Sequence, residues 1–143
     1  MADLPRRIEI VPWGQPKAVT GMTFTRYQSS SYLGGGLGGS DSAASVNNTI
    51  KFDVLLDAGT WAIDVLYTSS TGYGIVTFDL GGASLGTIDM YSAGANNNAS
   101  TISGITVSAA GYYTLTLTVA SKNASSSGYR SAYNLIVLRR TGA

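Results

Sequence analysis

Hydrophobic and polar residues alternate along this chain from about residue 49 onward. In "TIKFDVLL" (49–56) every second residue is apolar, and "WAIDVLY" (61–67) resumes the pattern after the turn-forming "DAGT". Strict alternation places the apolar side chains on one face of a β-strand, and two such runs across a glycine-containing turn predict a β-hairpin. No segment shows a helical period. The pattern therefore predicts strands.

Further strands are expected at regular intervals after this hairpin. They fall at 75–80, 85–91, 102–107, 112–120 and 131–140. The run 112–120, "YYTLTLTVA", is the clearest, because Tyr113 and the apolar residues in phase with it alternate with threonines. In the last run, Tyr133, Leu135 and Val137 are expected to share a face. Short strands at this spacing predict an all-β fold, an antiparallel β-sandwich of the jelly-roll type.

The first third of the chain has a different pattern. It holds all three prolines, which suit an extended arm or an edge strand, and we expect an N-terminal arm over 1–16. Residues 17–143 are expected to form one β-sandwich domain. Residues 29–48, which include "GGGLGG", are interpreted as a long Gly/Ser-rich loop. A loop of that length in a compact domain is usually functional or ordered by a partner.

The amino-acid composition says more about which chemistry the chain can perform than about its fold. The 143 residues include 12% charged residues, a net charge of +1, and neither cysteine nor histidine. Thiol chemistry, structural zinc sites and the most common general base are thereby excluded. There is no basic stripe for nucleic acid, no apolar run long enough for a membrane span, and no export signal. We expect a soluble protein that binds neither nucleic acid nor membrane.

The carboxylates do not form a catalytic pattern. Asp53, Asp64, Asp79 and Asp89 alternate with apolar residues on the expected strands, as on the solvent face of a sheet. A hydrolase that uses Asp64 or Asp79 is a third, disfavoured hypothesis. Asp41 and Asp57 are single candidate calcium ligands without a metal-binding motif around them. We therefore expect no catalytic residue, no metal and no cofactor.

Tyrosine is the one enriched residue type with binding potential. Of the nine copies, Tyr32, Tyr73, Tyr91 and Tyr129 fall in or beside expected loops. Loop tyrosines can pack at the base of a loop, anchor a protein interface or stack on a sugar ring. The sequence leaves these three roles open. Tyr73, Tyr91 and Tyr129 are the candidate glycan-facing residues.

From about residue 50 to the end, the chain resembles a β-sandwich module of tailed-bacteriophage virion proteins. The resemblance rests on "GTWAIDVLYTSSTGYGIVTFDLGGASLGTIDMY" and on "GITVSAAGYYTLTLTVASKNASSSGYRSAYNLIVLRR", with the loop 122–129 and the terminal "RRT" as its most specific parts. Such modules serve as head decoration (cement) proteins and as tail-fibre appendages. The chain also has a distant likeness to jelly-roll carbohydrate-binding modules. No catalytic residue is implied by either resemblance.

The leading hypothesis from this resemblance is a non-enzymatic virion structural protein that decorates the head. The implied partners are the major capsid protein or other virion proteins and further copies of the chain, with a trimer favoured. The implied location is the exterior of the virion head, or else the tail, with the host cytoplasm during assembly. The expected interface residues are Arg6, Arg7, Ile8, Ile10, Trp13, Tyr32, Leu33, Arg139 and Arg140. The alternative hypothesis is a glycan-binding module, such as the receptor-binding part of a tail fibre.

Overall fold

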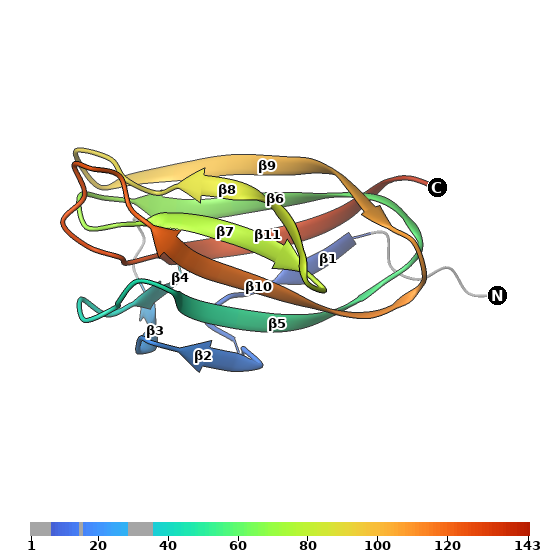
Figure 1. Ribbon diagram of the computed structural model, residues 1–143, viewed down its shortest axis with the longest axis horizontal. Coiled ribbons are helices and arrows are strands. Elements are labelled where there is room, and N and C mark those ends of the chain that lie inside the picture. Colours follow the sequence, from blue (N-terminus) through green and yellow to red (C-terminus); the bar gives the residue numbers. More distant parts are fainter. Residues whose placement is uncertain (1–6, 15, 29–35) are drawn as a thin grey trace.

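A computed structural model describes residues 7–14, 16–28 and 36–143, and it places them in two antiparallel sheets packed face to face (Figure 1). This confirms the predicted all-β sandwich. The strands are β1 (Arg7–Ile10), β2 (Ala18–Thr20), β3 (Phe24–Gln28), β4 (Gly36–Ser40), β5 (Asn48–Leu56), β6 (Gly59–Ser69), β7 (Ile75–Leu80), β8 (Ala83–Asp89), β9 (Asn96–Val107), β10 (Gly111–Ser121) and β11 (Ala132–Gly142). Among the described residues, no helix is long and apolar enough to cross a membrane.

The two sheets divide the strands almost evenly. One sheet has the order β3-β4-β11-β6-β9, with β1 also paired to β11, and the other has the order β2-β5-β10-β7-β8. Along the chain, strands 5 to 11 run back and forth between two ends of the sandwich. The connections β4–β5, β6–β7, β8–β9 and β10–β11 gather at the end opposite the chain termini (Figure 1). We call this end the loop end.

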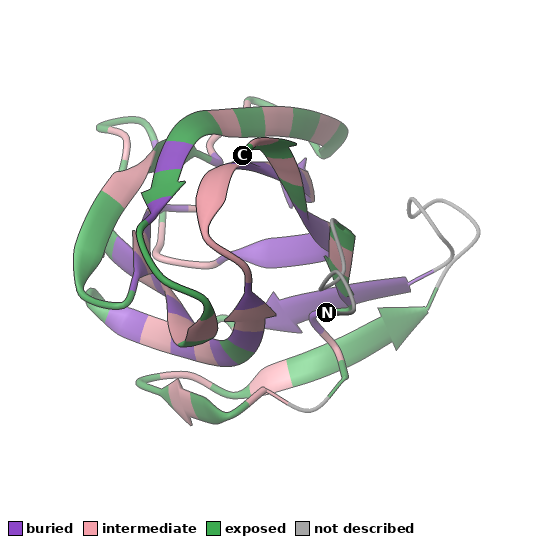
Figure 2. Ribbon diagram, turned by 90° about the vertical axis from the view of Figure 1, so that its right-hand side faces the viewer, coloured by how far each residue is buried: buried purple, intermediate pink, exposed green. Residues whose placement is uncertain are grey.

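The core lies between the sheets and follows the alternation in the sequence. Inward positions of β5 and β10, such as Ile50, Leu56, Leu115 and Leu117, are almost completely buried. Their outward neighbours are half-buried or exposed, so that buried and exposed segments alternate along the strands (Figure 2). The register between β5 and β10 is regular over nine residue pairs. These central strands fix the framework on which outward side chains are displayed.

The two runs on either side of Asp57 form β5 and β6, but these strands belong to different sheets and do not pair, so the predicted β-hairpin is wrong. The turn at Asp57 carries the chain from the smaller sheet to the larger one. The carboxylate of Asp57 accepts a hydrogen bond from the backbone N–H of Ala58, and its carbonyl accepts one from the indole N–H of Trp61. Gly59 has a φ of 144°, a conformation that only glycine adopts without strain. Trp61 is fully buried. The "Gly-Thr-Trp" motif is therefore explained by the turn and the core, without a binding role.

The "GGGLGG" stretch is only partly the loop that its composition predicts. Residues 36–40 form β4, which is buried throughout and pairs with β3 and β11. A Cβ atom on Gly36 would lie 3.0 Å from the ring of Trp13, and one on Gly38 would lie 2.7 Å from the ring of Phe24. Glycines here let aromatic rings pack directly on the backbone. Residues 29–35 lie outside the described residues.

The side chains of the last strand do not point in the directions that the sequence pattern predicts. The register of β11 against β6 shifts between Tyr133 and Leu135, as in a β-bulge. Because one extra residue reverses the side-chain alternation, Ile136 and Leu138 join Tyr133 in the core, whereas Leu135 is only half-buried. The prediction that Tyr133, Leu135 and Val137 share a face is wrong.

The structure describes the expected N-terminal arm from residue 7 onward. Residues 7–10 form β1, which pairs with β11 from Arg139 to Ile136, and Ile10 is buried in the core. This part of the segment 1–16 is thus a strand of the larger sheet.

Candidate functional site

Each of the tyrosines expected to face a glycan lies at the loop end. Tyr73 is in the β6–β7 connection, Tyr91 follows β8, and Tyr129 precedes β11. Tyr91 is half-buried, and its backbone N–H donates a hydrogen bond to Asp89 at 2.9 Å. The second oxygen of Asp89 accepts a hydrogen bond from Asn123 at 2.9 Å. Isolated bridges between Ser70 and Tyr91 and between Tyr73 and Arg130 join the three connections to one another.

The rings of Tyr73 and Tyr129 are already engaged within the chain. Both pack against the core cluster. The guanidinium of Arg130 lies 5.7 Å from the centroid of the Tyr73 ring, and the ammonium of Lys122 lies 5.2 Å from that of Tyr129. These are cation–π contacts, which cover the ring face that a sugar would stack on. The glycan-facing role of the loop-end tyrosines stays a prediction.

The residues expected at a subunit interface also make contacts within the chain. Arg7 pairs with Glu9 at 2.7 Å, Arg139 with Asp64 at 2.6 Å, and Arg140 with Asp57 at 3.5 Å. Ile8 packs beside the buried Ile10, and the ring of Trp13 lies under the guanidinium of Arg26 at 5.7 Å. Arg6, Tyr32 and Leu33 lie outside the described residues.

The carboxylates considered for catalysis are not brought together. Asp64 is on the outward face of the larger sheet, where it accepts hydrogen bonds from Arg139 and Thr101. These two donors, Arg139 first, lower its pKa from the ordinary value. Asp79 is on the outward face of the smaller sheet, on the other side of the core. The two groups cannot act on one bond.

A more accessible aromatic ring lies on the outward face of the smaller sheet. Tyr112, at the start of β10, is 79% exposed, the highest value among the exposed large hydrophobic residues. It borders a hollow of about 680 Å³. The other lining residues are Lys17, Lys51, Asp79, Gly81, Gly82, Tyr113, Thr114 and Thr116. We call this surface the Tyr112 face.

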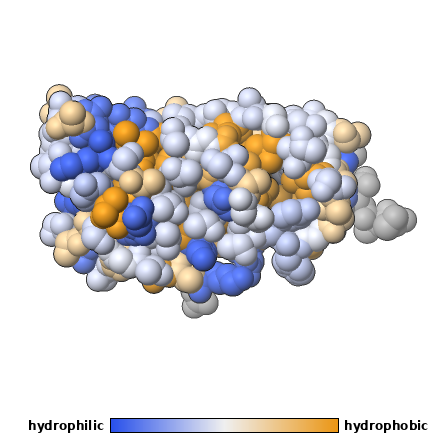
Figure 3. Space-filling view, in the orientation of Figure 1, coloured by the Kyte–Doolittle hydropathy of each residue, from blue (hydrophilic) through white to orange (hydrophobic). Residues whose placement is uncertain are grey.

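Polar groups on the Tyr112 face are arranged by the strand register. Thr114 is opposite Asp53 on β5, and Thr116 lies between Lys51 on β5 and Asp79 on β7. Figure 3, which has the orientation of Figure 1, shows hydrophilic, intermediate and hydrophobic residues mixed over the face that it presents. An accessible ring beside hydroxyl, carboxylate and ammonium groups can stack on a sugar and bond its hydroxyls.

One side of the Tyr112 face is held by an internal ion pair. The ammonium of Lys17 lies 3.0 Å from Oδ1 of Asp53, and the hydroxyl of Thr114 donates to the same oxygen at 2.8 Å. The hydrogen bond from Lys17, followed by that from Thr114, lowers the pKa of Asp53 below its ordinary value. The carboxylate is therefore ionised at neutral pH, and its charge is matched by Lys17.

The sequence contains a signal for Tyr112, although this residue is not among the tyrosines expected in loops. Tyr113 is in phase with the buried residues Leu115 and Leu117, so its neighbour Tyr112 must point outward on the same strand. The same reasoning places Lys51 outward between Ile50 and Phe52. An aromatic residue that alternates with the buried residues of a strand is therefore expected to be exposed, and this pattern indicates a candidate binding residue.

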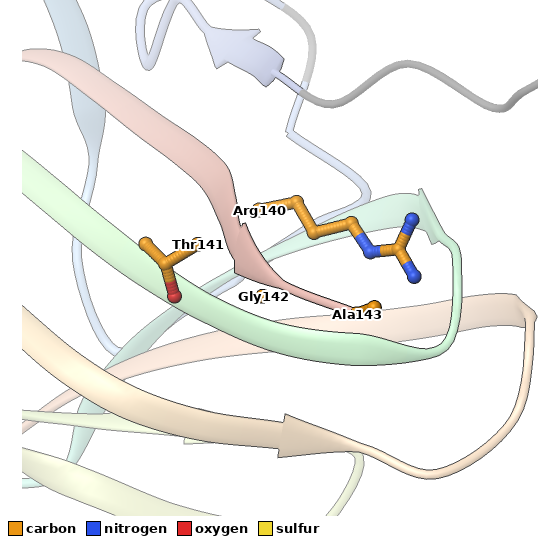
Figure 4. Close-up of a pocket in the computed structure, with 4 residues that line it drawn as sticks. All are labelled: Arg140, Thr141, Gly142 and Ala143. Carbon is orange, nitrogen blue, oxygen red and sulfur yellow. The ribbon is translucent and has the colours of Figure 1, made fainter.

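Two other hollows have fewer side chains that could bind a ligand. One of about 200 Å³ is lined by Arg140, Thr141, Gly142 and Ala143 at the end of β11 (Figure 4). Its one charged side chain, Arg140, is already bound to Asp57 and to the carbonyl of Ala58. Another, of about 410 Å³, opens between the edge strands β8 and β9 and is lined by serine, threonine and apolar side chains. Neither offers a ring as exposed as that of Tyr112.

Comparisons with known proteins identify the fold. No protein-family model matches the chain, and no curated protein does. Among solved structures, part of a Paenibacillus xanthan lyase is similar, with 25% identity over 88% of this chain and a TM-score of 0.75. This chain spans 12% of the length of that lyase.

Two carbohydrate-binding modules are similar over nearly their whole length. The module CBM6cm-2 from Cellvibrio mixtus lichenase 5A, solved in complex with cellotriose, shares 16% identity over 94% of this chain and 97% of its own, with a TM-score of 0.64. The module CBM36, solved in complex with calcium and xylotriose, shares 18% identity over 91% of this chain and 97% of its own, with a TM-score of 0.58. The chain has the fold of these carbohydrate-binding modules.

This finding overturns the resemblance to virion proteins. The similar structures include carbohydrate-binding modules, enzymes such as the xanthan lyase, and an insecticidal crystal protein with a TM-score of 0.69, and no bacteriophage protein is among them. The hypothesis of a capsid decoration protein, with virion partners and a trimeric assembly, is therefore wrong. In this chain the "Gly-Thr-Trp" motif behind it serves the turn after Asp57 and the buried core, so it gives no evidence of a virion role.

Calcium does not fit the residues that the structure describes. No group of three or more Asp, Glu, His or Cys side chains lies together in residues 7–14, 16–28 and 36–143. The loop-end carboxylate Asp89 is bound by Asn123 and by the backbone of Tyr91. Calcium takes six to eight oxygen ligands, several of them carboxylates, and this donor set falls short.

Proposed function

We propose that this chain is a non-catalytic module that binds a polysaccharide on the Tyr112 face. The observation that carries the proposal is the exposed ring of Tyr112 at the border of a hollow of about 680 Å³ lined by hydroxyl and charged side chains. The face of an aromatic ring beside polar side chains is a surface on which a sugar ring can stack. Folding leaves the apolar face of the Tyr112 ring exposed to water. A sugar ring stacked on it would bury that face.

The comparisons support a carbohydrate ligand over other small molecules. Two modules with this fold are described with cellotriose and with xylotriose. The hollow is open and lies across strands β5, β10 and β7, which suits an extended chain better than a small enclosed ligand. The separation of Asp64 from Asp79 supports binding without hydrolysis.

The test is binding to soluble polysaccharides by native affinity electrophoresis and calorimetry, with a neutral β-glucan, xylan and xanthan as probes. We expect wild-type protein to bind at least one of them and Tyr112→Ala to bind it at least tenfold more weakly. A tenfold change is about 1.4 kcal/mol, within the range of one aromatic anchor that becomes buried on binding.

Tyr129→Ala is the matched control, because it removes the same side chain at the loop end. It should bind as wild-type protein does. Loss of binding in Tyr129→Ala but not in Tyr112→Ala would move the site to the loop end and refute the Tyr112 face. Absence of binding to every probe would refute the proposed function.

A further inference from the structure

The cationic groups on the Tyr112 face are not equivalent. Lys17 is bound to Asp53, which also accepts the Thr114 hydroxyl, so this pair is satisfied within the chain. The other ammonium, that of Lys51, has neither an ion pair nor a hydrogen bond among the described residues. Lys51 is half-buried and points outward from the middle of β5. One positive charge in the hollow is thus left without a counterion.

The register separates Lys51 from Asp79, the other charged group on this face that forms no ion pair among the described residues. Thr116 on β10 is opposite Lys51 on one side and Asp79 on the other. Since adjacent strands lie about 4.8 Å apart, the backbones at Lys51 and Asp79 are roughly 10 Å apart. One oxygen of Asp79 accepts the backbone N–H of Gly82 at 2.9 Å. A sugar above Thr116 would therefore have an ammonium on one side and a carboxylate on the other.

This arrangement favours a ligand that carries its own negative charge on the β5 side. A neutral sugar would partly desolvate the Lys51 ammonium and offer only uncharged acceptors, whereas a carboxylate forms a stronger, charge-assisted hydrogen bond. Asp53 does not oppose such a ligand, because Lys17 already balances its charge. On the β7 side, Asp79 can accept hydrogen bonds from sugar hydroxyls.

We infer that the polysaccharide bound on the Tyr112 face is acidic, and that a carboxylate of the sugar pairs with the ammonium of Lys51. The inference rests on the proposed function and specifies its ligand class, a glycan with uronic acid or other carboxylated residues. The ammonium then supplies the positive charge directly, so this pairing does not require a divalent cation.

The test compares xanthan with carboxyl-reduced xanthan, and polygalacturonate with its carboxyl-reduced form. Each pair keeps the same chain and linkages and differs in the acidic group. We expect wild-type protein to bind the acidic form about tenfold more tightly at low salt, with the preference shrinking as NaCl rises. Lys51→Met should reduce binding to the acidic form to the level of the reduced form.

Lys122→Met is the matched control, because it removes an exposed ammonium at the loop end and should leave the preference unchanged. A Lys51→Gln variant and a thermal melt establish that any loss of binding does not come from unfolding. EDTA should have no effect, and loss of acidic binding on chelation would overturn the direct role of Lys51.

The two proposals fail in different ways. Equal binding of both members of each pair by wild-type and Lys51→Met protein, with loss in Tyr112→Ala, would overturn the acidic ligand and leave the Tyr112 face in place. Unchanged binding by Tyr112→Ala, or no binding to either form, would overturn the proposed function and with it this inference.

Discussion

Tyrosines at the two ends of the sandwich are in opposite situations. At the loop end, Tyr73 and Tyr129 pack against the core and each lies under a cation, Arg130 or Lys122. At the other end, Tyr112 extends from the first residues of β10 and is 79% exposed. The residue type is the same, but the first two rings are engaged in folding and the third is not.

The difference shows that a position in a loop does not make an aromatic ring available. Apolar area that folding has already buried cannot be buried again by a ligand, so it contributes to stability and not to affinity. Tyr112 keeps most of its area in water. Stability and binding should therefore respond in opposite ways to substitutions at the two ends, with the largest loss of stability at the loop end and the smallest at Tyr112.

The largest loss of stability is expected at the loop end from Gly74→Ala. A Cβ atom there would overlap Cγ1 of Val119 and lie 3.0 Å from the carbonyl oxygen of Ser121. Gly74 cannot shift easily, because its N–H donates to Arg130 and its carbonyl accepts from Met90. Overpacking of this kind costs about 3 kcal/mol. Urea unfolding should show the loss, with polysaccharide binding intact below the transition.

Gly94→Ala is the control for this variant. Gly94 lies at the same end of the molecule, but its added Cβ would have no atom within 4 Å. Its stability should stay close to that of wild-type protein. Equal stability of the Gly74 and Gly94 variants would mean that the loop end is loosely packed, and the comparison between the two ends would lose its basis.

The alternation in the sequence was sufficient to predict the strands at the centre of the fold. It located β5, β6 and β10, the turn at Asp57 and the sandwich class, because side chains on a strand with one buried face must alternate. It wrongly paired β5 with β6, since alternation does not tell which sheet a strand joins. It failed at β4, where glycines have low strand propensity and are retained because Trp13 and Phe24 pack on them. It failed again at β11, where a bulge reverses the facing after Tyr133.

The site was less predictable than the fold because it depends on contacts between distant segments. Lys17 and Asp53 are 36 positions apart in the chain and meet only when β2 lies beside β5. The cations over Tyr73 and Tyr129 likewise depend on how the loop end closes. The outward direction of Tyr112 and Lys51 was available from the strand period, but their neighbours were not.

A smaller loss of stability is expected from Tyr129→Ala. The ring is half-buried against the core and carries the cation–π contact with Lys122, so its removal should cost about 2 kcal/mol. Urea unfolding measures the change. Tyr129→Phe should recover most of it, since the aromatic ring and its contact remain. If Tyr129→Ala unfolds at the same urea concentration as wild-type protein, the Tyr129 ring contributes little to folding and is available for another partner.

The smallest effect on stability is expected from Tyr112→Ala, although it removes the same side chain as Tyr129→Ala. With 79% of the residue exposed, little apolar area is lost from the folded state, and the change should stay within about 0.5 kcal/mol. The neighbouring Thr114 and Asp53 keep their hydrogen bond, because neither depends on the Tyr112 ring. Urea unfolding and polysaccharide binding should be measured on the same preparation, since the expected result is normal stability with weakened binding. A loss of stability as large as that of Tyr129→Ala would mean that the Tyr112 ring supports the sheet. The tyrosines at the two ends would then differ only in how tightly they pack, and not in serving folding at one end and binding at the other.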